Sequence, residues 1–234
     1  MKKFFAPALA ILMLAASLSV APPSARAQGP GMISSILNKM DRNRRSLSSL
    51  RASVQMQKYN AQLRISEDRH GDVAYIASQG RDANVRVNWK SPGEILSVTG
   101  GEYKLYQPRL NQAYQGTTKK AGPSKGKAGG VLSLALTMSG AQAKNQFNVE
   151  LVGEGELYSG SPHVWWLKLV PRGAAEFQFA EIWVTDDGMP IQTRVTEKNG
   201  DATTVRLMNI QRNARVSLDE IKLDLPAGTK IVKS

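Results

Sequence analysis

The alternation of apolar and polar side chains is clearest between residues 85 and 115. The run VRVNWK at 85–90 changes from apolar to polar at every step, which is typical of a strand with one buried face. Two turn sequences follow, SPG at 91–93 and GG at 100–101, since Pro lacks an amide donor and Gly tolerates turn dihedrals. The stretch therefore predicts three short antiparallel strands joined by two turns.

Strand patterns of the same kind recur on both sides of this stretch. The polar run at 67–71 predicts a turn, and DDG at 186–188 and KNGD at 198–201 predict two tight hairpins. Counting the apolar-polar runs between turns predicts about ten or eleven strands, and a meander of that size either curls or closes.

Two helices are expected beside the strands. Apolar residues between 32 and 50 recur at spacings of three, four and seven, which predicts an amphipathic helix with one apolar stripe. The run VLSLALTM at 131–138 is apolar on nearly every side, so a helix there must be buried or must cover an apolar cavity. The lysine- and glycine-rich run at 116–130 predicts a loop, and its spacing fits no phosphate-binding motif.

The first residues have the features of a secretory signal. Lys2 and Lys3 precede an apolar run, and Ala25-Arg26-Ala27 matches a small-x-small cleavage site. We expect residues 1–27 to be removed after Ala27, which leaves one domain over 28–234. The alternative is an uncleaved anchor, although the apolar run is short for a membrane span. Export would place the mature protein in the periplasm.

Composition narrows the classes of function. The chain has no cysteine, so neither a disulfide nor a lipid-modified cysteine is available. The formal charge of +12 suits acidic partners or anionic lipid surfaces, with simple solubility as the alternative, while export argues against nucleic acid. The two histidines, His70 and His163, lie beside turn residues and make no metal-ligand spacing, and no nucleophile-elbow pattern is present. We therefore expect no enzyme, no cofactor and no metal, and a monomer.

What remains is the binding of an apolar ligand inside a curled sheet. Several strands carry large apolar side chains along one face, more than a single sheet face needs if helices also fill it. Ordinary core packing is the alternative for each of these residues. The predicted cavity wall consists of Val54, Met56, Val73, Tyr75, Val87, Trp89, Leu96, Leu105, Leu132, Leu134, Leu136, Met138, Trp165, Leu167, Leu169, Phe177, Phe179 and Trp183.

The order of these motifs resembles the periplasmic outer-membrane lipoprotein carriers, the LolA/LolB-like family. An amphipathic helix is followed by Gly71-Asp72-Val73 and by VRVNWKSPGEILSVTGGEYKLYQPRLNQA. After the apolar run come WWLKLVP, the strand pair DDGMPIQTRVTEKNGDATTVRLMNI and the ending LDEIKLDLPAGTKIV. The resemblance covers nearly all of residues 32–232.

This resemblance implies an incomplete, half-open antiparallel β-barrel, closed by the N-terminal helix and a short apolar lid helix over a hydrophobic cavity. It implies that the cavity holds lipoprotein acyl chains, received from an inner-membrane ABC-type release complex and delivered to an outer-membrane acceptor. The family's arginine before a proline, which is thought to lock the lid, has no match, because Arg81 is not followed by proline. A non-catalytic β-domain that binds another lipid or a partner protein is the alternative.

Overall fold

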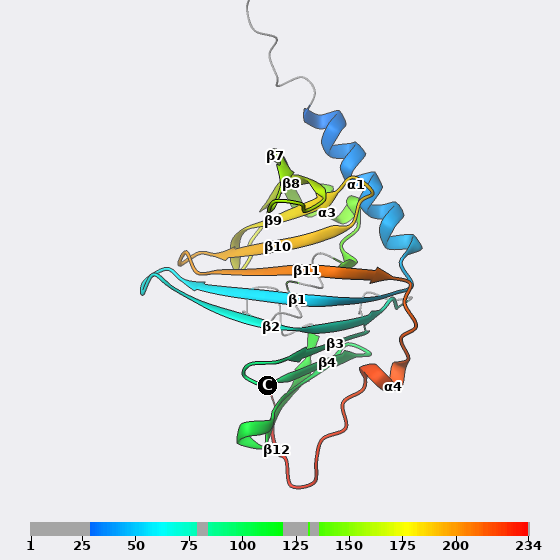
Figure 1. Cartoon of the computed structure of the whole chain (residues 1–234). Coiled ribbons are helices and arrows are strands. Elements are labelled where there is room, and N and C mark those ends of the chain that lie inside the picture. The colour runs from blue at the N-terminus through cyan, green and yellow to red at the C-terminus, as the bar shows by residue number, and fades with distance from the viewer. Residues whose placement is uncertain (1–28, 79–83, 119–130, 132–135, 234) are drawn as a thin grey trace, which may run out of the picture.

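The computed structural model describes residues 29–78, 84–118, 131 and 136–233. Within these residues one twelve-stranded sheet dominates the molecule (Figure 1). The strands are β1 (Ser49–Asn60), β2 (Ile65–Ile76), β3 (Asn84–Trp89), β4 (Ile95–Thr99), β5 (Glu102–Gln107), β6 (Gln112–Thr117), β7 (Phe147–Glu156), β8 (His163–Pro171), β9 (Phe177–Thr185), β10 (Pro190–Glu197), β11 (Ala202–Arg212) and β12 (Lys230–Lys233). The helices are α1 (Gly29–Ser46), η2 (Pro108–Leu110), α3 (Gly140–Gln146) and α4 (Leu218–Ile221).

The strand order across the sheet is β12-β6-β5-β4-β3-β2-β1-β11-β10-β9-β8-β7. Neighbouring strands are antiparallel except β12, which lies parallel to β6. The edge strands β7 and β12 do not pair with each other, so the sheet is open. The expectation of ten or eleven strands was too low, because β12 is a four-residue strand outside the hairpin meander and its partner β6 is distant in the sequence.

The predicted amphipathic helix exists but begins and ends earlier than its apolar pattern suggested. Helix α1 spans Gly29–Ser46, and β1 begins at Ser49. Leu47 and Leu50 were assigned to the helical stripe, and both are buried, Leu47 in the connection and Leu50 in the strand. Their spacing fitted a helix because both segments turn apolar side chains towards the same core.

The turn predicted at 67–71 was wrong. Strand β2 runs without interruption from Ile65 to Ile76, and the hairpin turn lies at 61–64, where Leu63 N donates to Asn60 Oδ1. The half of β2 next to the hairpin turn has no buried face, so its polar residues are compatible with a strand. Gln57 on β1, for example, donates a hydrogen bond to its cross-strand partner Asp68. The polar residues at 67–71 therefore indicate an exposed part of a strand and not a turn.

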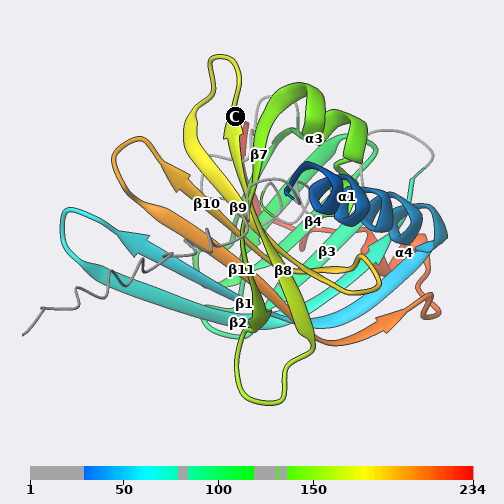
Figure 2. The ribbon, with the colours of Figure 1, turned by 90° about the horizontal axis from the view of Figure 1, so that it is seen from above.

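One face of the sheet, called the inner face below, carries the apolar core. Cross-strand partners such as Val54 and Leu207, or Val87 and Leu96, belong to one buried cluster. Helix α1 contributes its apolar stripe, including Leu37, to the same cluster. Figure 2 shows α1 and α3 lying together on one side of the strands. The helices therefore cover the inner face.

Helix α3 was not expected, because Ser139-Gly140 predicts the end of the preceding helix. Ser139 instead caps α3: its hydroxyl accepts from Gln142 N, and the Gln142 side chain accepts from Ser139 N. Of the predicted helix at 131–138, Val131, Leu136 and Thr137 are helical. Residues 132–135 lie outside the described part of the chain, so the lid helix as a whole stays a prediction.

The C-terminal segment crosses the opposite, outer face over β3 to β6. Ile221 of α4 is fully buried, and Leu223 packs with Tyr106 and Ala113 in a second, smaller cluster. Polar side chains of the strands bind the backbone of this segment: Arg86 donates to Lys222 O at 2.7 Å. This crossing carries the chain from β11 to the far edge of the sheet, where β12 pairs with β6.

Candidate functional site

The inner face brings together most of the predicted cavity wall. Cross-strand registers align its members over the neighbouring strands β1 to β5, for example Val73 with Val87 and Leu96 with Leu105. All belong to the apolar cluster or pack against it. These inner-face residues are Val54 and Met56 on β1, Val73 and Tyr75 on β2, Val87 and Trp89 on β3, Leu96 on β4, Leu105 on β5, and Leu167 and Leu169 on β8.

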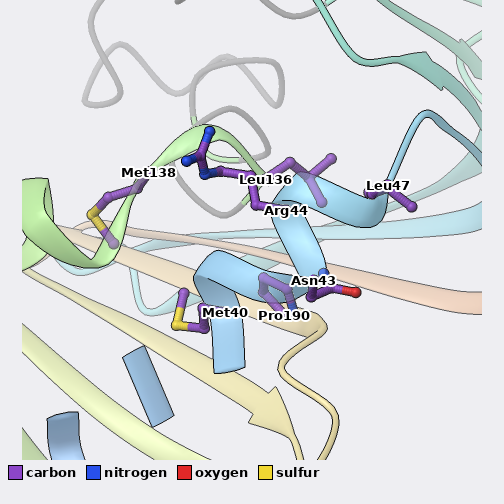
Figure 3. A pocket seen from close by; sticks show the side chains of 7 residues that line it. All are labelled: Met40, Asn43, Arg44, Leu47, Leu136, Met138 and Pro190. Carbon is purple, nitrogen blue, oxygen red and sulfur yellow. The ribbon is translucent and has the colours of Figure 1, made fainter. Parts of the chain in front are cut away.

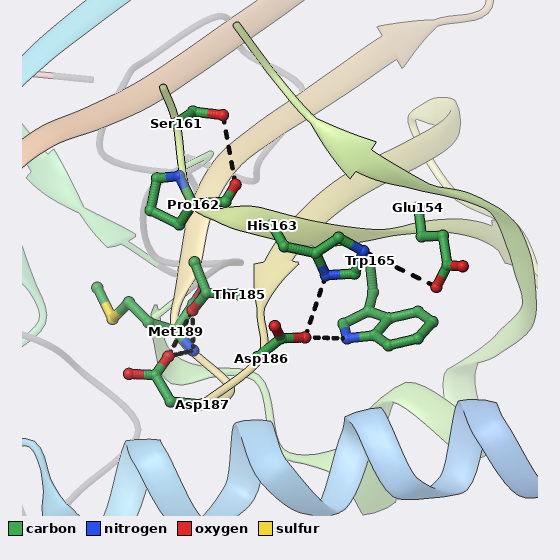
Figure 4. Close-up of polar contacts among 9 residues, drawn as sticks. All are labelled: Glu154, Ser161, Pro162, His163, Trp165, Thr185, Asp186, Asp187 and Met189. Atoms are coloured by element: carbon green, nitrogen blue, oxygen red, sulfur yellow. Dashed lines mark hydrogen bonds and ion pairs between the residues drawn. The ribbon is translucent and has the colours of Figure 1, made fainter. Parts of the chain in front are cut away.

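Trp165 lies at the margin of this wall. It shares the strand parity of Leu167 and packs partly against the core, but its indole Nε1 donates to Asp186 Oδ1 at 2.9 Å (Figure 4). The His163 ring meets its edge at a centroid distance of 5.2 Å. Trp165 therefore joins the apolar interior to the polar turn between β9 and β10.

Phe179 and Trp183 lie on the opposite face of β9 from Ala180 and Ile182, although Trp183 is buried and belongs to the main apolar cluster. Trp183 is the cross-strand partner of Trp166, and their rings stack 5.3 Å apart. Phe179 carries the Lys168 ammonium 4.4 Å above its ring. Their neighbours Ala180 and Ile182 take the inner positions instead. The sequence did not show this placement, because β9 carries apolar residues on both faces. The size of a ring therefore did not show on which face of the strand it lies.

The remaining predicted wall residues lie near the helices. Phe177 stacks on Phe147 with ring centroids 6.3 Å apart. Leu136 and Met138 are buried in the main cluster together with Val131. Leu132 and Leu134 lie outside the described residues.

Sequence reasoning missed the part of the inner wall that comes from β10 and β11. Val195, Val205 and Leu207 are buried in the main cluster. Their alternation with polar residues is visible in the sequence, but such small side chains are a weaker sign of a cavity wall than large aromatic ones. Thr193 lies among them and is 2% exposed, and its hydroxyl has no hydrogen-bond partner in the described structure. A buried hydroxyl without a partner is an unusual cost in an otherwise apolar wall.

A small pocket lies at the seam between α1, residues 136–138 and the start of β10. Its volume is about 10 Å³, which is the room of one water molecule. Figure 3 shows the guanidinium of Arg44 beside the ribbon that carries Leu136 and Met138. The lining residues are Met40, Asn43, Arg44, Leu47, Leu136, Met138 and Pro190.

The Arg44 charge also reaches the inner wall. Burial raises the pKa of the Tyr75 phenol, and the positive charge of Arg44 opposes that rise. Tyr75 lies on β2 and is buried. The charge of Arg44, which belongs to α1, therefore affects the pKa of a side chain on the inner face.

A second polar group lies away from the seam and joins Arg69 of β2, Glu94 in the connection from β3 to β4, and Gln107 at the end of β5. Arg69 Nη1 donates to Glu94 Oε2 at 2.5 Å, and Gln107 Nε2 donates to Glu94 Oε1 at 2.8 Å. Burial, followed by the charge of Arg69, lowers the pKa of the nearby Lys58 ammonium. Glu94 and Gln107 also line a pocket of about 170 Å³ with Pro92, Gly93, Pro108, Arg109 and Leu110.

Other chemistry finds little support in the described part of the chain. Its histidines and carboxylates form no group able to hold a metal ion. No helix there combines the length and the apolarity needed to cross a bilayer. His163 has two carboxylates nearby, Asp186 at 3.1 Å and Glu154 at 3.9 Å, and these contacts tie β8 to its neighbours (Figure 4).

Comparison with solved structures finds the same fold in proteins of distant sequence. An uncharacterized conserved protein from Thermus thermophilus is 17% identical, with a TM-score of 0.52 over 85% of this chain and 97% of that one. MucB is 13% identical, with a TM-score of 0.54 over 86% of this chain and 66% of MucB. The MucA/MucB complex of Pseudomonas aeruginosa gives a TM-score of 0.50 at 13% identity, over 82% and 61% of the two chains. No curated protein sequence matches.

The match to a protein-family model is more specific than this similarity of fold. The model described as "Outer membrane lipoprotein carrier protein LolA" matches residues 45–224, which include every strand from β1 to β11. This range contains the inner face, the strand side of the seam pocket and the outer crossing of α4. The chain belongs to the LolA family of outer-membrane lipoprotein carriers.

Proposed function

We propose that this protein is a periplasmic carrier that holds the acyl chains of lipoproteins against its inner face and moves them from the inner to the outer membrane. The observation that carries the proposal is the continuous apolar inner face, which extends from β5 to β1 and on over β11, β10 and β9 to β8. Among the described residues it is covered by helical segments and not by a second sheet. Removal of residues 1–27, an ABC-type release complex as donor and an outer-membrane acceptor are parts of the same proposal.

The physical task is to keep hydrocarbon out of water. A free acyl chain costs about 0.8 kcal/mol per CH₂ in water, so one long chain costs on the order of 10 kcal/mol. The inner face of this protein is filled by its own side chains, among them Val131, Leu136 and Met138. In the proposed cycle the segment at 131–138 acts as a lid: an acyl chain takes its place on the inner face, and the segment returns at delivery.

The test measures lipid binding with a matched pair of variants. Leu105 is half-buried on the inner face, whereas Leu110 is 66% exposed in η2, the turn that follows β5. We expect Leu105→Glu to abolish the binding of a triacylated lipopeptide, seen by native mass spectrometry, and Leu110→Glu to leave it unchanged. Thermal unfolding of both variants checks that they fold. Equal binding by Leu105→Glu and the unaltered protein would refute a ligand on the inner face.

A patch on the outer face favours a second function, the binding of a partner protein. Trp166, Phe179 and Tyr158 lie there with Lys168 above the Phe179 ring and Arg206 5.5 Å from the Tyr158 ring. Aromatic and basic residues together are typical of protein interfaces. The outer positions of β1, such as Gln55 and Gln57, are polar by contrast, and a fold relative, MucB, has been solved with MucA.

This second function predicts a defined cross-link. A photo-reactive residue in place of Tyr158 should capture one periplasmic protein, and Arg206→Glu should abolish the capture. The same residue placed at Tyr59, which is exposed on β1, is the control. Identical products from both positions would show that the outer patch has no partner of its own.

A further inference from the structure

We propose that Arg44 binds the oxygen-rich end of the acyl lipid, at the seam between α1 and residues 136–138. This inference rests on the proposed carrier function, and it assigns the polar recognition that an apolar face alone cannot supply. The ligand chemistry is that of a diacylglyceryl group, whose ester oxygens accept hydrogen bonds; in a phospholipid the phosphate oxygens do so as well. Both lipoproteins and phospholipids carry such an end.

The first argument is an unused donor. Arg44 Nε is buried and has no hydrogen-bond acceptor in the described structure. Its carboxylate neighbour on α1, Asp41 Oδ1, is 3.8 Å away and already accepts from Gly140 N at 2.9 Å. A guanidinium offers five donors and no acceptor, and leaving one of them buried and unpaired is unfavourable. An oxygen brought by a ligand would remove that cost.

The second argument is the shape and lining of the seam pocket. Its room of about 10 Å³ suits one oxygen atom rather than a whole head group. Met40, Leu47, Leu136 and Met138 surround the cation with hydrocarbon. A site of this kind matches the point where an ester oxygen meets an acyl chain, and the bulk of the head group would remain in water, on the exposed side of Arg44.

The third argument is continuity with the inner face. Leu136 and Met138 line the seam pocket and belong to the inner cluster as well. Tyr75, on the inner wall, lies within the electrostatic reach of Arg44. A lipid anchored at Arg44 therefore has its chains directed onto the proposed wall.

The experiment compares two arginines of one helix. Arg45 is the next residue of α1 and is exposed, so Arg45→Gln removes the same charge without touching the pocket. Binding of a synthetic triacylated lipopeptide and of phosphatidylglycerol is measured by native mass spectrometry and by fluorescence titration. We expect Arg44→Gln to weaken binding about tenfold or more, as the loss of a hydrogen bond to a charged group implies, and Arg45→Gln to leave it unchanged.

The two lipids identify the source of the oxygen. A loss for both lipids assigns the site to the esters that they share. A loss confined to the lipopeptide assigns it to the acylated end of a lipoprotein, and a loss confined to phosphatidylglycerol assigns it to a phosphate. Arg44→Gln that binds both lipids like the unaltered protein would overturn the inference and leave the carrier function standing. If the unaltered protein binds neither lipid, the carrier function and this inference fail together.

Discussion

The backbone amide of Gly140 donates a hydrogen bond to the carboxylate of Asp41, 2.9 Å away, and so fixes the start of α3 against the middle of α1. The two helices approach so closely that a Cβ at Gly140 would lie 2.8 Å from Asp41 Oδ2 and 3.3 Å from Leu37 Cβ. The cover of the inner face is therefore held by a contact that leaves no room for a side chain at residue 140.

Gly140→Ala should destabilise the protein by about 1–3 kcal/mol, because the added methyl group overpacks the junction of α1 and α3. Denaturant unfolding measures this loss. Gly31→Ala is the matched control, since Gly31 is also helical and a Cβ there meets nothing within 4 Å. The control should be neutral or slightly stabilising through helix propensity. Equal stabilities of the two variants would contradict the close approach.

Gly188→Ala should loosen α1 from the sheet. Gly188 has φ +89° in the turn between β9 and β10, and a Cβ would lie within 2.3 Å of the backbone carbonyl of Lys39. We expect a loss of about 2 kcal/mol or more, with faster amide exchange in α1. Gly200→Ala is the control: Gly200 has the same φ, but its Cβ would meet only the Ala61 side chain, at 3.1 Å. Gly200→Ala should lose less stability, and that smaller loss measures chiefly the cost of backbone strain.

Glu94→Ala should cost about 3–5 kcal/mol, as expected when one partner of a buried ion pair is removed. The side chains of Arg69 and Glu94 are only 16% and 11% exposed, so the change leaves the Arg69 charge short of a partner, with the exposed Glu67 as its remaining carboxylate. Asp72→Ala breaks the exposed Lys90–Asp72 pair and should cost less than about 1 kcal/mol. Thermal unfolding ranks the two, and a reversed order would contradict the burial of the Arg69–Glu94 pair.

Asp187→Asn should make stability less dependent on acid pH. Burial would raise the pKa of Asp187, but hydrogen bonds from Thr185 and Arg212, with the charge of Arg212, outweigh it and lower the pKa below 3.8. A depressed pKa stabilises the fold above the unfolded value, and the gain disappears as the pH falls through the folded value. The difference between the two proteins should be constant above about pH 5 and should shrink in stronger acid.

Glu197→Gln should change the pH dependence of stability in the opposite direction. Burial, followed by the charges of Asp201 and Glu176, raises the pKa of Glu197 above 4.5, so its ionised form opposes folding near neutral pH. The variant should be more stable than the unaltered protein at neutral pH, and the gain should disappear in acid. Urea unfolding across the acid range up to neutral pH measures both variants. A parallel pH dependence for Asp187→Asn and Glu197→Gln would contradict the assigned directions.

Much of the fold was predictable because its signals are local. The hairpin turns at Gly100, Gly188 and Gly200 all have positive φ, as their sequences predicted. The failures at 67–71 and at 47–50 have one cause: exposure and burial were interpreted as secondary structure. A polar strand that leaves the core and an apolar connection that enters it give misleading periods.

The site was less predictable, because the type of a residue does not show on which face of a strand its side chain lies. Trp183 and Ile182 are adjacent, apolar and buried in the same cluster, yet Ile182 shares a face with Leu167 and Trp183 lies on the other face with Trp166. The choice is made by the register with β8 and β10, including a bulge between Pro190 and Gln192. Arg44 could not be found from sequence either, since its neighbours Leu136 and Pro190 come from distant parts of the chain.

Strand β12 has a consequence for self-association. The open sheet ends at β7 on one side, and β12 occupies the backbone hydrogen-bonding groups of β6 on the other. Without the four residues of β12, the longer edge of β6 would face solvent opposite the edge of β7. Edges of this kind on successive molecules can add to one another without closure, and fibres grow in that way. With β12 in place, this side of the sheet ends in a strand of four residues instead of the six of β6, and a shorter edge offers a neighbouring molecule less backbone to pair with.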